Sequence, residues 1–526
     1  MSTHRSFRSA MTWLHTWSGL LLGWVLYAIF ITGTTAYFRP EITAWMQPET
    51  AIVAAPADAA RAGFKRLQEI APESKRWLVS VPDDRSRELK IYWEDPQSGK
   101  RFKNEDVSQP GEKNSVPRAT LGGEFFYRFH FQLMLPHPWG RFLACTAALF
   151  MFVALISGIV THRRFFKDLF LLRLGRDGRR PWLDFHNVTA VLALPFYLMI
   201  SYSALVIFTP MLMPLAAKFL VPAKPAPAAV AGRELARAPE NLNSPAPDAA
   251  SWITPDKFEL MLAHVEKTWS TERSVKRIEI THRGTPQASA TFTRDSAPST
   301  SYVFTDREVL KFSGLTGLPL ANPAPPVKSL GTRIRGVFYG LHLAHFAGPA
   351  LRALFFLMGT MGAAMVGTGL VLWTLKRKDR LTESGRGGRF GYGLVSRLNI
   401  TAITGLPIAC AGFLWANRLI PAAQAGRADL ETTCFLIVWG VAALHAFARP
   451  AKFAWKEQLL AAAFAFGALP LVDLLTAGRQ LDTWPRAEGL YVYFTAALLL
   501  LGALFGYGAF KISKRRARDA APGGAL

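Results

Sequence analysis

The chain contains little cysteine and little acidic charge. Only three cysteines occur among its 526 residues, Cys145, Cys410 and Cys434, and each stands alone in an apolar stretch. They form no CxxC pair and no disulfide framework, which argues against iron–sulfur and thiol chemistry. Asp and Glu total 37 against 61 Lys and Arg, which gives a formal net charge of +24.

Long hydrophobic runs are abundant instead. Half of the residues are hydrophobic and the mean hydropathy is +0.16, which is too apolar for a soluble protein of this length. A helix needs about 20 mostly apolar residues to cross a bilayer. We therefore predict a mainly α-helical integral membrane protein with about eight transmembrane helices, in the runs 13–38, 142–161, 187–216, 353–375, 394–420, 431–447, 457–478 and 489–510.

The basic residues gather where these runs end, so the net charge indicates topology and not a nucleic-acid partner. Short loops rich in Lys and Arg stay on the cytoplasmic side of a membrane. We expect both termini to be cytoplasmic and residues 39–125 and 217–335 to lie on the far face. The basic segments that set this orientation are 5–8, 163–180, 376–389, 449–456 and 511–518.

The first part of the chain repeats itself. The first hydrophobic run opens with Trp13-Leu14-His15 and the third with Asp184-Phe185-His186. The second opens with a Phe-Tyr-x-x-His motif that ends at His130, and the fourth opens with the same motif ending at His342. The second and fourth close with Ser157-Gly158 and Thr368-Gly369, which we interpret as turns.

The two exterior segments repeat as well. Each is predicted to hold one amphipathic helix, at 57–70 and 255–269, followed by three strands. Each is therefore a small α+β module between two spans. The predicted strands are 77–81, 88–93 and 101–103 in the first module and 276–281, 289–294 and 301–305 in the second, which an Ala/Pro-rich linker at 221–250 precedes.

These features divide the chain into nine parts. Residues 394–526 have a single histidine and no likeness to the repeated half, so we predict a separate C-terminal membrane domain of four helices and a basic tail. The other predicted parts are 1–38 (N-terminus and first span), 39–125 (first module), 126–162 (second span), 163–183 (loop), 184–216 (third span), 217–335 (linker and second module), 336–375 (fourth span) and 376–393 (basic loop).

The histidines pair through the repeat. His15 and His186 recur at equivalent cytoplasmic ends of spans, and His130 and His342 recur at equivalent exterior ends. Two repeats packed about a pseudo-twofold axis bring each pair face to face. A haem iron between helices takes one axial imidazole from each side. We therefore predict two haems, of the b type, one near each membrane face, because two are the minimum for moving electrons through about 30 Å of hydrocarbon.

Other residues rank below these four. His162 and His345 are second-choice ligands, since their repeat equivalents are Trp373 and Leu133. Arg141 and Arg352 occupy similar places after their histidines, where either could pair with a haem propionate or extend to the interface. Pro136 and Pro138 are expected to break the helix between His130 and His162.

The order and duplication of these motifs resemble the PepSY-associated transmembrane family, often called iron-regulated membrane proteins. The likeness covers about residues 10–380, and both exterior modules resemble PepSY-type domains. The resemblance implies a bacterial inner-membrane reductase that acts on ferric siderophores or other Fe(III) chelates in the periplasm. It carries over haem ligation to His15, His130, His186 and His342.

Our hypothesis from the sequence is therefore a transmembrane ferric reductase that receives electrons from a cytoplasmic reductase or from quinol. Two alternatives stay open. One is a permease or export factor whose histidines relay protons, and the other is a membrane-anchored binding or regulatory protein that uses its PepSY-like modules.

Overall fold

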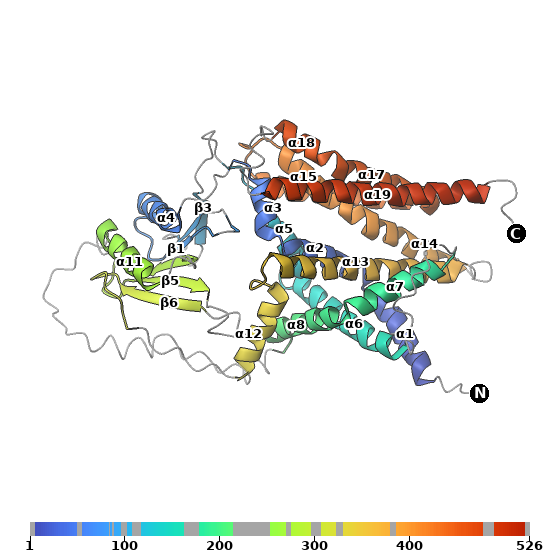
Figure 1. The fold of residues 1–526 in the computed structure, drawn as a ribbon, viewed down its shortest axis with the longest axis horizontal. Coiled ribbons are helices and arrows are strands. Elements are labelled where there is room, and N and C mark those ends of the chain that lie inside the picture. The colour runs from blue at the N-terminus through green and yellow to red at the C-terminus, as the bar shows by residue number, and fades with distance from the viewer. Residues whose placement is uncertain are drawn as a thin grey trace. The chain divides into compact units, whose positions relative to one another are not determined.

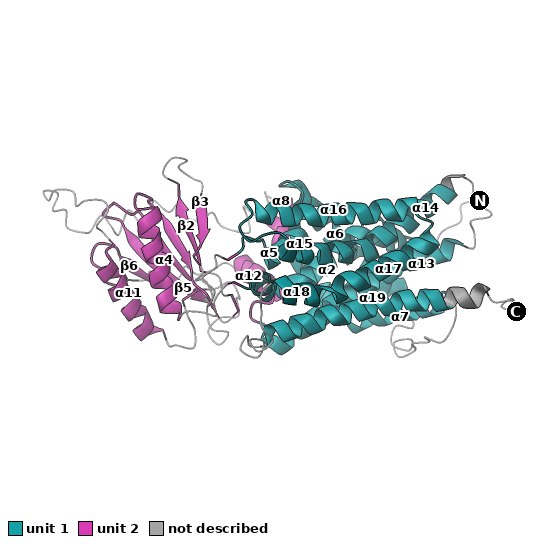
Figure 2. Cartoon of the chain, turned by 90° about the horizontal axis from the view of Figure 1, so that it is seen from above, with its two compact units in different colours: residues 1–48, 118–205, 347–526 teal, residues 49–117, 206–346 magenta. Residues whose placement is uncertain are grey.

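The computed structural model separates into two compact units (Figure 2). The first unit comprises residues 1–48, 118–205 and 347–526, and the second comprises 49–117 and 206–346. The predicted linker at 221–250, the predicted strand at 301–305 and His162 lie outside the residues that the structure describes. Those residues are 6–49, 55–83, 85–86, 89–95, 102–107, 117–161, 178–213, 253–269, 275–295, 307–321, 330–378, 386–476 and 489–520.

The helices confirm a mainly α-helical membrane protein (Figure 1). Within the described residues, seven helical segments are long and apolar enough to cross a membrane, or eight if α1 and α2 form one broken span. The helices are α1 (Phe7–Leu21), α2 (Gly23–Ala36), α3 (Arg39–Met46), α5 (Gly123–Gln132), α6 (Trp139–Thr161), α7 (Arg180–Leu192), α8 (Leu194–Leu212), α12 (Leu330–Leu343), α13 (Pro349–Lys378), α14 (Arg386–Ile400), the π-helical turn η2 (Thr401–Gly405), α15 (Leu406–Leu419), α16 (Arg427–Ala448), α17 (Ala451–Gly467), α18 (Leu469–Thr476) and α19 (Leu490–Ala520).

The first and third predicted spans are each broken once. α1 and α2 meet at Leu22 with a bend of 63°, and α7 gives way to α8 at Ala193. Each break lies seven residues after a candidate histidine, His15 or His186. The repeat seen in the sequence therefore extends to the backbone.

The prolines break the second span as predicted. α5 ends at Gln132 and α6 begins at Trp139, so His130 lies on a short helix of its own. Proline removes a backbone donor and clashes with the preceding turn, which is why no helix continues through Pro136 and Pro138.

The C-terminal spans pack as part of the first unit, which differs from the separate domain expected from the sequence. α14 packs on α13, and η2 packs on α2. A shared apolar core explains the difference, since Phe125 of α5 stacks on Phe413 of α15 with ring centroids 4.2 Å apart.

Buried charges hold α15 to its neighbours. Arg427 and Glu431 of α16 form an ion pair whose side chains are both 0% exposed. Arg418 donates to Asp473 of α18 at 2.7 Å, and Asn417 donates to Glu431 at 2.8 Å. Buried charges are costly unless they are paired, so these contacts fix the packing of α15, α16 and α18.

The first helix begins and the last helix ends at the same end of the first unit (Figure 1). The basic end of α13, at residues 376–378, lies at that end too. This arrangement agrees with termini on one side of a membrane, whereas which side is cytoplasmic stays a prediction.

The second unit contains one six-stranded antiparallel sheet, with strands in the order β3-β2-β1-β4-β5-β6. β1 of the first module pairs with β4 of the second, so that Trp77 faces Ile280 and Val79 faces Ile278. The strands are β1 (Trp77–Ser80), β2 (Lys90–Glu94), β3 (Phe102–Asp106), β4 (Arg277–Thr281), β5 (Ser289–Asp295) and β6 (Arg307–Ser313), and the helices are α4 (Pro56–Ile70) and α11 (Pro255–Thr268).

The two predicted modules are thus joined into a single layer. α4 and α11 lie on the same face of the sheet (Figure 1), where Phe64 stacks on Phe258 at 4.1 Å between ring centroids. Each module alone would expose an unpaired edge strand, and the pairing of β1 with β4 removes both edges.

One ion pair across this join is partly buried. Asp83, which follows β1, lies 3.3 Å from the Lys276 ammonium, which precedes β4. Burial alone would raise the pKa of Asp83, but hydrogen bonds from the backbone of Ser86 and Arg85 together with Lys276 lower the pKa below its usual value.

Candidate functional site

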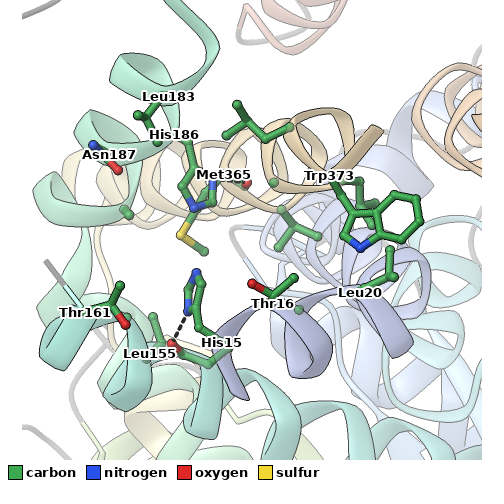
Figure 3. Close-up of a pocket in the computed structure, with 18 of the residues that line it drawn as sticks. His15, Thr16, Leu20, Leu155, Thr161, Leu183, His186, Asn187, Met365 and Trp373 are labelled. Atoms are coloured by element: carbon green, nitrogen blue, oxygen red, sulfur yellow. Dashed lines mark hydrogen bonds between the residues drawn. The ribbon is translucent and has the colours of Figure 1, made fainter. Parts of the chain in front are cut away.

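His15 and His186 face each other inside the first unit (Figure 3). Their ring centroids are 6.4 Å apart and the ring planes are inclined at 72°. His15 comes from α1 and His186 from α7, as the repeat predicts. Two metal–imidazole bonds of roughly 2.0–2.1 Å, plus about 1.1 Å from each nitrogen to its ring centre, give about 6.3 Å. The observed spacing therefore suits one metal ion between the two rings.

Each imidazole is anchored through Nδ1 to a backbone carbonyl. His15 Nδ1 lies 2.8 Å from the Ala154 oxygen of α6, and His186 Nδ1 lies 2.8 Å from the Met365 oxygen of α13. A carbonyl oxygen only accepts hydrogen bonds, so Nδ1 carries the hydrogen of the neutral ring and donates it, and Nε2 keeps the lone pair. This is the arrangement that orients a histidine for metal binding.

Glycines make room for both rings. A Cβ atom on Gly158 would lie 3.1 Å from His15 Cε1, and one on Gly369 would lie 3.2 Å from His186 Cε1. The prediction that Ser157-Gly158 and Thr368-Gly369 are turns is wrong, because both pairs lie within α6 and α13. Their hydroxyls bond to carbonyls within the helix, and their glycines make room for the imidazoles; the Thr368 hydroxyl also lies 3.3 Å from His186 Nδ1.

The rings lie in a cavity of about 670 Å³ between α1, α6, α7 and α13. Leu20, Leu155, Leu183 and Trp373 contribute to its mostly apolar wall (Figure 3). Four basic residues line the same cavity at the ends of α7 and α13, namely Arg179, Arg180, Lys376 and Arg377. The site therefore combines an apolar interior with a cationic end that suits an anionic group.

Sequence reasoning did not assign these four basic residues to the site. It used them only as topology signals, although the sequence places them directly next to the predicted helices that carry His186 and Gly369. The carbonyls of Ala154 and Met365 carry no side-chain signature and could not have been found. Gly158 and Gly369 stand out in the sequence, but there their pattern indicates turns and not contacts with the imidazoles.

His130 has the same kind of anchor as the first pair. Its Nδ1 lies 2.9 Å from the Ile29 oxygen of α2, and a Cβ on Gly33 would lie 2.4 Å from that nitrogen. Arg141 lies over the Phe131 ring at 5.2 Å, and within the described residues its buried Nε has no hydrogen-bond partner. α5 thus carries a second anchored imidazole, and Arg141 of α6 lies over the ring of the next residue.

The remaining predicted residues are elsewhere. His342 lies near the end of α12 and the exposed His345 lies just beyond it, both in the second unit. The pairing of His130 with His342 therefore stays a prediction. Arg352 is engaged with Glu41 at 3.3 Å and donates to the Ala347 oxygen.

The fold and the cavity define a multi-span membrane protein with two partly buried imidazoles that face each other between two structural repeats. Residues 12–376 match the sequence model of the PepSY-associated TM region. The chain belongs to this family. Comparison with curated proteins found no relative.

Proposed function

We propose that this protein is a haem-binding membrane reductase that carries electrons across a bilayer to ferric iron. The observation that carries the proposal is the pair His15 and His186, whose Nδ1 anchors and 6.4 Å ring spacing suit axial ligation from opposite faces of one iron. A bound haem iron accepts and releases one electron at a time.

The donor set favours a haem over a bare metal ion. Among the described residues, no group of three or more His, Cys, Asp or Glu side chains could hold a metal ion. Two imidazoles alone leave most coordination positions of an iron unfilled, whereas a porphyrin supplies four nitrogens of its own. The cavity volume of about 670 Å³ falls within the range of cofactor sites.

Charge supports the same assignment. Haem carries two propionate groups, and Arg179, Arg180, Lys376 and Arg377 line one end of the cavity. Arginine forms bidentate hydrogen bonds with carboxylates, so this end would hold the propionates while the apolar wall excludes water. Arg377 also lies over the Trp373 ring at 3.8 Å, which holds its guanidinium beside the cavity.

A second haem would use His130 and His342, with Arg141 near its propionates. Electrons would enter on the cytoplasmic side at the His15 and His186 site, from a cytoplasmic reductase or from quinol. They would leave on the side of the two α+β modules, in the periplasm of a bacterial inner membrane. The acceptor would be a ferric siderophore or a similar Fe(III) chelate, because hard oxygen ligands hold ferric iron more tightly than ferrous iron.

The test is a reduced-minus-oxidised absorption spectrum of the purified protein with its haem content. We expect two haems per chain in the wild type and one in His186→Ala. Imidazole added to His186→Gly should restore the lost band, which separates ligand loss from misfolding. His282→Asn is the matched control, because His282 is exposed in the second unit and its φ of 55° suits Asn.

Two results would overturn the proposal. A wild-type protein that has no Soret band after expression with ample haem would favour the permease or the binding protein. An unchanged spectrum in both His15→Ala and His186→Ala would refute the ligand pair.

A further inference from the structure

The fifth span contains a π-helical turn in the middle of the first unit. Such turns leave backbone carbonyls without their usual helical partners and occur often at functional sites. Here side chains from other helices fill the gap. Trp439 Nε1 donates to the Thr401 oxygen at 3.0 Å, and the Tyr27 hydroxyl donates to the Ile403 oxygen at 3.2 Å.

A chain of hydrogen bonds runs from this turn to an acid–base pair. Thr404 donates to Gln458 Oε1 at 2.7 Å, and both residues are buried. Gln458 Nε2 lies 3.3 Å from His445 Nδ1, and His445 Nε2 lies 2.8 Å from the Glu457 carboxylate. Because the amide nitrogen of Gln458 is a donor, His445 Nδ1 accepts and its proton lies on Nε2, facing Glu457.

The His445 and Glu457 side chains are partly exposed, whereas Thr404 and Gln458, the other members of this hydrogen-bond chain, are buried. The side chains of His445 and Glu457 are 33% and 35% exposed. Val441 and Leu444 on the same helix are 59% and 72% exposed, so this face of α16 is apolar and exposed, as expected of a surface that faces lipid. Arg449, in the basic connection that follows, also pairs with Glu457.

The same span reaches the wall of the imidazole cavity. Asn399 accepts from Trp24 Nε1 at 2.9 Å and donates to the Leu370 oxygen at 3.0 Å. Leu370 lines the cavity of His15 and His186. One helix, α14 with its π-helical turn, therefore connects the lipid-facing pair to the proposed haem site.

We propose that His445 and Glu457 form the proton-accepting site for a membrane-dissolved hydroquinone, which donates electrons to the cavity of His15 and His186. The inference rests on the proposed function and names its electron donor. A lipid-soluble donor fits because the pair is reached from the hydrocarbon. A hydroquinone fits because it releases two protons and the site offers two bases.

The reaction balances at this site. Both hydroxyl O–H bonds of the hydroquinone break, and the ring becomes a quinone as two electrons leave it, one at a time, for the haem. One proton goes to the Glu457 carboxylate and one to Nδ1 of the His445 imidazole, because Nε2 already carries a hydrogen. Rotation of the Gln458 amide would turn Oε1 toward the protonated ring. Protons would leave to water past the half-exposed Arg449, which donates to Glu457 at 2.6 Å.

Two measurements test the site in nanodiscs. The first is binding of decylubiquinone, followed by quenching of tryptophan fluorescence, which requires no haem. The second is reduction of bound haem by decylubiquinol in stopped flow, with dithionite as a donor that needs no site. We expect His445→Ala to weaken quinone binding and both His445→Ala and Glu457→Gln to slow hydroquinone-driven reduction by about tenfold or more. Dithionite should reduce every variant fully.

Leu475→Ala is the control, because Leu475 is 73% exposed on α18, away from the pair. Failure of wild type to bind decylubiquinone, or equal rates and quenching in the two variants and wild type, would overturn the inference and favour a cytoplasmic donor. The same experiments distinguish failure of this inference from failure of the proposed function. Quinone binding that His445→Ala weakens, in a protein without a Soret band, would refute the haem and leave the hydroquinone site.

Discussion

At the scale of single residues, small side chains and backbone oxygens set the orientation of the imidazoles. The repeat in the sequence was sufficient to predict that His15 and His186 face each other, because the two residues stand at equivalent positions of the two copies. It was not sufficient to find what orients them. The anchors are carbonyls of Ala154 and Met365, and any residue has a carbonyl.

We expect Gly369→Val to remove the haem that we propose for His186. A Cβ there already lies 3.2 Å from the ring, and the added methyl groups would push the imidazole off its anchor. Haem content per chain and thermal unfolding would be measured together. Gly440→Val is the control, because a Cβ at Gly440 meets nothing within 4 Å. A fully loaded Gly369→Val protein would show that the glycine does not position the ligand.

At the scale of elements, hydropathy located the spans well, because their apolar length is read directly from composition. It did not locate the breaks at Leu22 and Ala193, since both sit inside uninterrupted apolar runs. It also gave no sign that α15 is held by buried ion pairs. Arg418 and Arg427 stand at span ends in the sequence, where charged residues usually reach solvent.

Glu431→Ala should therefore destabilise the first unit by about 3–5 kcal/mol, because it leaves the Arg427 guanidinium buried without its carboxylate. Glu259→Ala removes a surface pair with Arg61 and should cost about 0–1 kcal/mol. Denaturant unfolding of both variants in the same detergent gives the comparison. Equal losses for the two would mean that burial does not set the strength of the Arg427 pair.

At the scale of the whole molecule, the sequence predicted two exterior modules and the structure has one continuous sheet. Helix and strand periodicity are local signals, and they identified α4, α11 and most of the strands. The pairing of β1 with β4 joins residues about 200 positions apart, and no local pattern specifies it. The Asp83 and Lys276 ion pair belongs to that join.

We expect the sheet to lose stability in acid through Asp83. A carboxyl whose pKa is lowered by folding adds stability above its unfolded pKa of about 3.9, and this is lost as the pH falls through the folded value. Asp83→Asn should therefore be less stable at neutral pH and show a flatter acid dependence. Hydrogen-exchange protection of β1 and β4 amides across the acid range measures both the stability of the sheet at neutral pH and its acid dependence. Parallel acid profiles for wild type and variant would exclude Asp83 as the cause.

The anchors of the two imidazoles also bear on how such a chain arises. His15 bonds to Ala154 within the first repeat, and His186 bonds to Met365 within the second. Each repeat thus holds a finished half of the cavity without help from the other. A half-length ancestor that associated as a symmetric pair would have built the whole cavity at its own interface, and gene duplication with fusion would have needed no new contact to preserve it.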